Sequence, residues 1–331
     1  MTARRNLLLA LVAGALSATL PSLAQQPVKI RRIGFLATRW RSTPEKPDIY
    51  YDAFMQGMRE LGYVEGKNLA IEWRFAEGKF ERLPALATEL VQMNVEVIVV
   101  GGTPETQAAQ RSTSTIPIVM TSISDPVGSG FARSLARPGG NITGLSLMSP
   151  DISPKMLELL KTMLPKLSRF AILVNPSNPS AAAILEGVLA AARQFGIKAV
   201  IVKARTTEEI EQAFTIMARE RVDACISLAD PFFSSQRQKI VELAAKHRLP
   251  AMYGQREYVE SGGLMSYSAN FADLYRRAAI YVDKILKGAK PDDLPIEQPT
   301  RIHFAINRNT ATALKLKIPQ ELLLRADEVI D

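Results

Sequence analysis

Acidic and hydroxyl side chains stand where apolar, β-branched runs of the chain end. Asp125 and Asp230 each follow such a run and directly precede a proline, while Thr38 and Thr103 follow two other runs. A carboxylate is a suitable partner for an ammonium group, whereas hydroxyl groups and helix N-termini favour a carboxylate. These residue types therefore indicate recognition of a small charged solute, although each aspartate before a proline could instead only set its turn.

The side chains at strand ends are expected to meet in one cleft, because ligands of open parallel sheets bind outside the carboxyl ends of the strands. Thr103 is expected to cap a helix whose first residue is Pro104, and the preceding glycines let a ligand approach the backbone. Three aromatic residues of the set could stack on a ligand ring or pack in the core. The predicted ligand-binding residues are Thr38, Gly102, Thr103, Ser122, Asp125, Asn175, Asp230, Phe232, Tyr253 and Tyr267.

Catalytic, metal-binding and cofactor-binding motifs are weak or missing in the sequence. The two histidines, His247 and His303, have no ligand-type residues at metal-binding spacing. A G-x-S-x-G elbow and a P-loop are absent, and Gly128-Ser129-Gly130 lacks the rest of a dinucleotide fingerprint. We therefore expect no metal, no cofactor and no enzymatic activity; a hydrolase using the paired carboxylates of Asp125 and Asp230 is the catalytic alternative.

Short β-rich runs alternate with longer helical patterns, which is typical of parallel sheets built from βαβ units. The expected strands are 32–37, 69–75, 95–100, 116–121, 170–174, 198–203, 224–228 and 251–253. The expected helices are 48–61, 82–93, 153–164, 181–195, 207–219 and 234–247. The fold class predicted from this pattern is α/β, with mainly parallel sheets flanked by helices.

Three extended connections interrupt the alternation and predict two lobes joined by a hinge. Pro138-Gly139-Gly140-Asn141 leads into an extended piece at 142–147, Gly262-Gly263 leads into another at 264–267, and a proline-rich connector covers 291–299. The predicted division is a signal peptide at 1–24, an N-terminal lobe of 25–144 and 269–295, and a C-terminal lobe of 145–268 and 296–331.

The first 24 residues have the three parts of a cleavable signal peptide. Arg4 and Arg5 supply the positive region, an apolar stretch follows, and Ser22-Leu23-Ala24 forms a small-x-small cleavage site. The apolar stretch is shorter than the about 20 residues that a permanent membrane span needs. The residue directly after the cleavage site is Gln25 and not a cysteine, so we expect a periplasmic protein that is not a lipoprotein, with the Sec and twin-arginine routes both open.

Composition is that of a globular protein of ordinary charge. Without Arg4 and Arg5, 39 basic residues face 33 acidic ones, a net charge of +6, and the basic residues are scattered among acids. Nucleic-acid binding would require a clustered basic stripe, so we expect no nucleic-acid partner. The single cysteine, Cys225, lies in an apolar run, where a buried and inert thiol is expected.

Several segments of the chain follow, in order, the pattern of one protein family. They are Gly62-Tyr-Val-Glu-Gly-Lys67 with Trp73-Arg74, Ile116-Pro-Ile-Val119 leading to Asp125-Pro-Val127, Ala136-Arg-Pro-Gly-Gly-Asn-Ile-Thr-Gly144, Leu173-Val-Asn-Pro176, Gly262-Gly-Leu-Met-Ser-Tyr267, Ala279-Ile-Tyr-Val-Asp-Lys-Ile-Leu-Lys-Gly288 and Arg325-Ala-Asp-Glu-Val-Ile330. In these segments the chain resembles the substrate-binding components of ABC transporters, in the tryptophan/tyrosine-type branch. The chain departs from the family pattern at Ser268-Ala-Asn270 and at Ile302-His-Phe-Ala305. The first departure touches a hinge or cleft segment, so the resemblance does not fix the ligand.

The resemblance implies a two-lobed periplasmic binding protein with a type I-like fold and three hinge crossovers. Such a receptor closes around an amino-acid-like or aromatic-acid ligand and delivers it to an ABC permease and its ATPase in the inner membrane. An extracytoplasmic sensor subunit is an alternative role for the same fold. The ligand, its affinity and the oligomeric state are left open by the sequence.

Overall fold

Strands and helices alternate along the computed structural model, which describes residues 29–44 and 47–331. The signal peptide expected at 1–24 lies outside these residues. All the elements described below belong to one compact unit, Arg31–Asp331. Within this unit the strands form two separate sheets, so each is taken in turn.

The first sheet is wholly parallel and has the strand order β2-β1-β3-β4-β5. Its strands are β1 (Arg31–Ala37), β2 (Leu69–Phe75), β3 (Val97–Val100), β4 (Ile118–Ile123) and β5 (Ile142–Ser146). β3 and β4 are buried throughout their length, as strands covered by helices on both faces must be. The carboxyl ends of these parallel strands therefore lie at one edge of the sheet.

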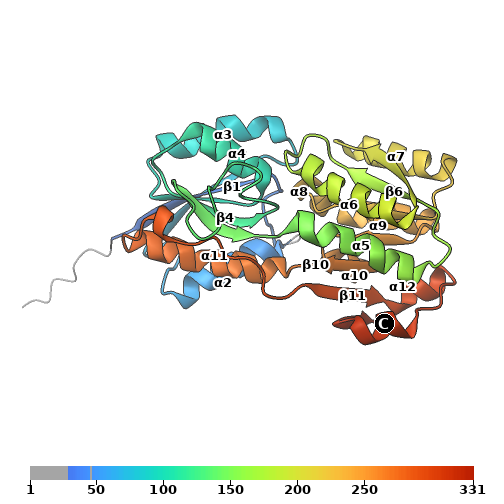
Figure 1. The fold of residues 1–331 in the computed structure, drawn as a ribbon. Coiled ribbons are helices and arrows are strands. Elements are labelled where there is room, and N and C mark those ends of the chain that lie inside the picture. Colours follow the sequence, from blue (N-terminus) through green and yellow to red (C-terminus); the bar gives the residue numbers. More distant parts are fainter. Residues whose placement is uncertain (1–28, 45–46) are drawn as a thin grey trace, which may run out of the picture. The chain divides into compact units, whose positions relative to one another are not determined.

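Helices cover both faces of the first sheet (Figure 1). They are α2 (Ile49–Glu60), α3 (Leu83–Gln92), α4 (Thr103–Ser112) and α11 (Phe271–Leu286), with short 3-10 turns at η1 (Phe80–Arg82) and η2 (Pro291–Asp293). Ile33 and Phe35 of β1 pack with α2 and α11, whereas Leu36 packs with α3 and α4. This alternation follows from the two-residue period of a strand, and it gives the lobe two hydrophobic layers.

The second sheet has the order β12-β11-β10-β9-β8-β6-β7. Its strands are β6 (Arg169–Val174), β7 (Lys198–Lys203), β8 (Ala224–Ser227), β9 (Ala251–Tyr253), β10 (Met265–Ser268), β11 (His303–Asn307) and β12 (Glu328–Ile330). Its neighbouring strands are parallel except β10 and β11, which are antiparallel. The exception has a topological cause, because between β10 and β11 the chain leaves this sheet to form α11 on the first.

Helices also cover both faces of the second sheet. They are α5 (Ser149–Met163), α6 (Ala181–Phe195), α7 (Thr207–Arg219), α8 (Pro231–Ser235), α9 (Arg237–Lys246), α10 (Glu257–Glu260), α12 (Arg308–Ala313) and α13 (Gln320–Arg325). Phe170 and Ile172 pack with α5 and α6, and the alternate residues Ala171 and Leu173 pack with α7 and α9. The predicted α/β fold of two mainly parallel sheets flanked by helices is thus confirmed.

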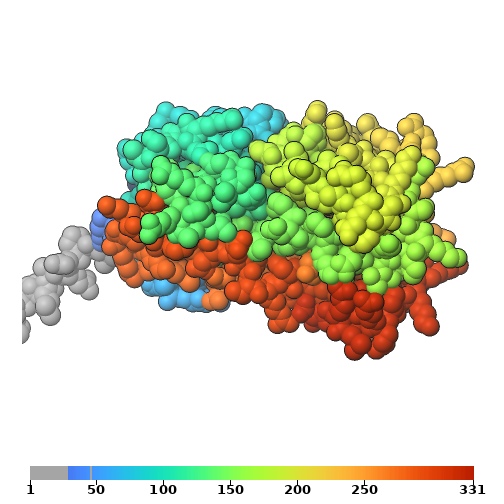
Figure 2. All heavy atoms as spheres, viewed as in Figure 1, coloured from blue at the N-terminus to red at the C-terminus, as the bar shows by residue number. Residues whose placement is uncertain are grey.

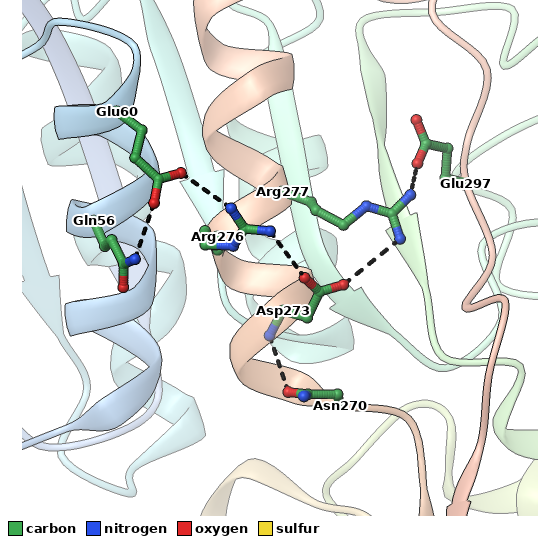
Figure 3. A network of polar contacts seen from close by, with 7 residues as sticks. All are labelled: Gln56, Glu60, Asn270, Asp273, Arg276, Arg277 and Glu297. Atoms are coloured by element: carbon green, nitrogen blue, oxygen red, sulfur yellow. Dashed lines mark hydrogen bonds and ion pairs between the residues drawn. The ribbon is translucent and has the colours of Figure 1, made fainter.

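The chain passes between the two lobes three times: after β5, after β10, and before β11. The third passage contacts β5, from which the first passage leaves, because Glu297 pairs with Leu145 and donates its backbone N–H to Gly144 at 3.0 Å. A polar network holds the second and third passages together (Figure 3). In it, Asn270 caps α11 at Asp273, and Arg277 of the same helix forms ion pairs with both Asp273 and Glu297.

Candidate functional site

A cavity lies between the carboxyl ends of the two sheets and is lined from both lobes. It has room of about 30 Å³ for water-sized molecules and opens to solvent. Its lining residues follow β1, β3 and β4 on one side and β6, β8 and β9 on the other, with α11 closing one wall. They are Arg39, Gly101, Gly102, Thr103, Glu105, Ser122, Ser124, Leu147, Asn178, Ala229, Asp230, Pro231, Gln255, Phe271 and Tyr275.

Asp230 is the acidic residue that the C-terminal lobe contributes to the cavity. It is the N-cap of α8, and its Oδ1 accepts a hydrogen bond of 3.0 Å from the backbone N–H of Phe233. The side-chain amides of Asn175 and Asn178 also donate to it, at 3.3 and 2.8 Å. Burial raises the pKa of this carboxyl, and the hydrogen bonds oppose that effect. Its donors are all neutral, so when Asp230 is ionised they orient its charge without cancelling it.

Glu105 is the matching acid from the N-terminal lobe, in the first turn of α4. Only 1% of this residue is exposed. Its Oε1 accepts a 2.6 Å hydrogen bond from the backbone N–H of Thr38, whereas its Oε2 is buried and has no hydrogen-bond partner among the described residues. Burial raises the pKa of Glu105, hydrogen bonding at Thr38 opposes the rise, and the nearby charge of Asp230 adds to it.

Arg39 is the cation that lines the cavity, and its charge is already matched inside its own lobe. Its Nε and Nη2 atoms contact Oδ2 of Asp48 at 2.7 and 2.5 Å, and its guanidinium lies 4.4 Å from the ring centroid of Tyr50. Burial opposes the charged form of Arg39, but the Asp48 carboxylate and the neighbouring tyrosines Tyr51, Tyr50 and Tyr275 together outweigh it and raise the pKa of the guanidinium. Among the residues that line the cavity, Glu105 and Asp230 therefore have no cationic partner.

The two lobes are in direct contact around the cavity. Nη1 of Arg39 donates to Oγ of Ser234 in α8 at 3.1 Å, which joins one lobe to the other. Phe80 packs against hydrophobic clusters of both lobes, and Gly102 lies close to the Pro231 ring. Figure 2 shows the lobes touching on the face that it presents.

Four of the ten predicted binding residues line the cavity: Gly102, Thr103, Ser122 and Asp230. Two more contact residues of the lining. The side-chain amide of Asn175 donates to Asp230, and the backbone N–H of Thr38 donates to Glu105. The expectation that Thr103 caps its helix is wrong. Gly102 is the N-cap and Thr103 the first helical residue, because the extended backbone before the helix includes Gly102.

The other four predicted residues lie elsewhere. Asp125 borders an adjoining hollow that shares Ser124 with the cavity, and its carboxylate accepts from the backbone N–H of Gly128. Phe232 is buried next to Phe233, and Tyr253 stacks on Tyr258 in the C-terminal lobe. Tyr267 borders a different hollow beside α5. None of these four lines the cavity between Glu105 and Asp230.

Several residues that line the cavity were not in the predicted set, and Glu105 is the most consequential. The signal for it was present in the sequence: an acid three residues after a helix N-cap, at the position whose side chain reaches back over the first turn. Gln255 lies two residues beyond the predicted Tyr253, after the same strand, whereas Tyr275 comes from a helix that the sequence alone does not place beside this cleft. The hydroxyl of Tyr275 donates a hydrogen bond to the carbonyl oxygen of Gly101 at 3.1 Å, so α11 also positions the loop that contains Gly101 and Gly102.

The comparisons with known proteins agree with this architecture. The family described as ABC transporter substrate binding protein matches residues 45–330, and the chain belongs to that family. A tyrosine-binding protein of Clostridioides difficile (strain R20291) is 27% identical over 279 residues, which covers 83% of this chain and 80% of the relative. The predicted resemblance is confirmed, and so is the expectation of a binding protein rather than an enzyme.

Two solved structures are similar over 91% of this chain and 100% of their own. One is a conserved domain protein from Vibrio cholerae O1 biovar El Tor strain N16961, with 30% identity and a TM-score of 0.84. The other is the ABC domain from Streptococcus pneumonia in complex with L-Trp, with 27% identity and a TM-score of 0.82. The second matches this chain across both lobes, so the lobes are arranged here much as in that complex.

Two further observations concern the described residues alone. No group of three or more metal-ligating side chains is found among them. Within the same part of the chain, no helix has the length and apolar character that crossing a membrane requires.

Proposed function

We propose that this chain is an exported solute receptor that binds an amino-acid-like or aromatic-acid ligand in the cavity between its lobes. It closes about the hinge on binding and delivers the ligand to an ABC permease and its ATPase in the inner membrane. The observation that carries the proposal is the cavity itself, to which each lobe contributes a buried acid, Glu105 or Asp230. Neither lobe alone forms this site, so binding and closure are coupled.

The relatives support the ligand class. One is described as a tyrosine-binding protein and another was solved with L-Trp, and both are similar over most of this chain. Phe271 and Tyr275 supply apolar and aromatic surface in the cavity, while Ser122, Ser124 and Gln255 supply neutral hydrogen-bonding groups. Such a lining fits a small molecule with one apolar part and a few polar groups.

The contacts across the cleft support hinge closure. The bond from Arg39 to Ser234 and the packing of Phe80 join lobes that the chain connects only through its three passages. Domain closure about such passages is a common response to ligand in two-lobed proteins. The export signal expected at 1–24 and cleavage before Gln25 complete the proposal, with the mature protein acting in the periplasm.

The first experiment is a thermal-shift screen of the protein lacking residues 1–24 against amino acids, aromatic acids and the matching amines. A ligand present at 100 times its Kd adds about 2.7 kcal/mol to the free energy of unfolding. We expect at least one member of this panel to raise the melting temperature in proportion to the logarithm of its concentration. A panel without any such ligand would contradict the proposed ligand class.

A second experiment locates the site. Asp230→Asn removes a buried charge from the cavity, and Asp125→Asn is the matched control because Asp125 borders a different hollow. Removing one partner of a buried charge pair costs about 2–5 kcal/mol, which is about 30-fold or more in affinity. We expect that loss for Asp230→Asn and less than about threefold for Asp125→Asn, a difference well below the 1.4 kcal/mol of a tenfold change. Equal effects of the two substitutions, measured calorimetrically, would place the ligand elsewhere.

Closure is tested by small-angle X-ray scattering. We expect the radius of gyration to fall when the screened ligand saturates the protein. A radius that is unchanged by saturation, starting from a free protein whose scattering fits separated lobes, would rule out hinge closure.

A further inference from the structure

The cavity has an imbalance of charge that points to the ligand. Its titratable groups are Arg39, Glu105, Asp230 and Tyr275, and the one cation among them is paired with Asp48 outside the lining. Two carboxyl groups are thus brought near one another from opposite lobes, and the cation in the lining is already paired. Burying an ionised carboxylate without a partner is costly. The contacts that join the lobes are therefore more favourable when a positively charged ligand occupies the cavity.

Glu105 contributes an atom that the protein leaves unsatisfied. Its Oε2 is buried without a hydrogen-bond donor among the described residues, while Oε1 is held by the backbone of Thr38. The side chain is thereby fixed on one oxygen and available on the other. Asp230 is fixed in a comparable way by Phe233, Asn175 and Asn178. Both acids are positioned by neutral groups and lack only a charged donor.

We propose that Glu105 and Asp230 together bind a protonated amino group of the ligand, so the cavity takes amine-bearing ligands and rejects acids that lack an amine. The inference rests on the proposed function, in that it assumes this cavity to be the ligand site, and it narrows the ligand class named there. A primary ammonium has three N–H donors, which suffices for one carboxylate from each lobe and a neighbouring neutral acceptor. The ligand's positive charge then links the two lobes directly.

The carboxylate of an amino acid would meet weaker partners in the same cavity. The Arg39 guanidinium is already engaged by Asp48, so hydroxyl groups, the Gln255 amide and backbone N–H groups are left for an anion. Recognition should consequently depend more on the amine than on the carboxylate. The contribution of the ligand's charged groups to affinity can therefore be measured separately from that of its aromatic ring.

The experiment uses two series of compounds that differ only in their charged groups. The first comprises L-tyrosine, tyramine and 3-(4-hydroxyphenyl)propionic acid, and the second comprises L-tryptophan, tryptamine and 3-(indol-3-yl)propionic acid. Binding to the unaltered protein lacking residues 1–24 is measured calorimetrically. We expect that in at least one series the compound without an amine binds about 30-fold more weakly than the amino acid, while the compound without a carboxylate loses less than about tenfold.

Glu105→Gln tests the role of Glu105 independently of folding effects. If Glu105 binds the amine, the substitution weakens the amine-bearing ligands by about tenfold or more and leaves the amine-free acid within about threefold. A purely structural role would weaken both kinds of ligand alike. Asp125→Asn is the control for removing an acid from the same edge of the sheet without touching the cavity.

The outcomes separate this inference from the proposed function. An amine-free acid that binds as tightly as its amino acid overturns the inference but leaves a receptor in place, and so does Glu105→Gln weakening all compounds equally. If neither series nor the wider panel contains a ligand, the proposed ligand class fails and the inference fails with it.

Discussion

Nη1 of Arg39 donates a hydrogen bond of 3.1 Å to Oγ of Ser234, and this bond joins the end of β1 in one lobe to α8 in the other. The guanidinium is held from its own side by Asp48 and lies over the ring of Tyr50. Because Arg39 is fixed by its own lobe, the bond to Ser234 forms only when α8 reaches it. The contact is thus a direct measure of whether the lobes are together.

Ser234→Ala should weaken ligand binding by about 3- to 10-fold, because one net hydrogen bond contributes about 0.5–1.5 kcal/mol to the state that contains it. The matched control is Ser235→Ala, since the Ser235 hydroxyl donates to the carbonyl of Phe232 in its own helix and crosses no cleft. Both variants are compared calorimetrically with the ligand found in the screen. Equal affinities for Ser234→Ala and the parent would show that the bond does not stabilise the bound state.

Gly102 is a point at which the two lobes leave little room. A methyl group added there would lie 2.9 Å from Oε2 of Glu105 and 3.1 Å from Cγ of Pro231, which belongs to the opposite lobe. Its φ of −169° is extended, so alanine meets no backbone strain and its effect is one of space alone. Contacts this short require Glu105 or Pro231 to move apart.

Gly102→Ala should therefore weaken ligand binding by about tenfold or more, since overpacking a well-filled site costs about 1–3 kcal/mol. In the free protein the lobes can separate and relieve the contact with Pro231, so any fall in its melting temperature should come from the contact with Glu105, which lies in the same lobe as Gly102. Gly140→Ala is the control, as a methyl group at Gly140 meets nothing within 4 Å. A Gly102→Ala protein that binds normally and becomes equally compact with ligand would mean that Pro231 does not approach Gly102 in the bound state.

Cys225 should be unreactive in the folded protein. It is buried in β8, and burial raises the pKa of its thiol to about 12, so almost no thiolate exists at pH 8. We expect a disulfide-exchange reagent such as dithionitrobenzoate to label the native protein over hours at most slightly, and the denatured protein fully within minutes. Rapid stoichiometric labelling of the native protein would indicate that β8 opens readily.

Much of the fold was predictable because its strands are runs of apolar, β-branched residues between turn signals. The strand expected at 69–75 coincides with β2, and the helix expected at 207–219 coincides with α7, which Thr206 caps as such side chains do. The predicted helix boundaries were wrong where prolines or tertiary contacts determine the ends of the helices. The helix expected from Ser153 begins at Ser149 and contains Pro154, and the one expected at 234–247 is divided at Gln236 into α8 and α9.

The site was predictable in its location and less so in its members. The carboxyl ends of parallel strands meet at one edge of each sheet, and the cavity lies between these two edges, which is why Ser122 of one sheet and Asp230 after a strand of the other both line it. Glu105 escaped prediction because an acid in the first turn of a helix is favourable on a surface as well. In the folded protein Glu105 is buried, and the backbone N–H of Thr38, 67 residues away in the chain, donates to it. Pairings between distant loops of this kind are set by packing, so the local pattern marks an acid in the first turn without showing that it is buried.

Glu105 should also make the stability of the ligand-free protein depend on pH. Burial raises its folded-state pKa above the ordinary value of 4.5, and Asp230 across the cleft adds to the rise, while Arg39 is occupied by Asp48. Between the unfolded and the folded pKa the native state binds more protons than the unfolded state. The free energy of unfolding therefore falls as the pH rises through that window.

Glu105→Gln removes this dependence. The stability of the variant relative to the parent should thus increase as the pH rises from about 4.5 through the raised pKa of Glu105, and then remain constant. Urea unfolding at closely spaced pH values measures the difference, and Asp125→Asn provides a control whose side chain lies outside the cavity. The opposite slope, with Glu105→Gln losing relative stability as the pH rises, would mean that the folded protein stabilises the Glu105 carboxylate. In that event Glu105 would need no ammonium partner from the ligand.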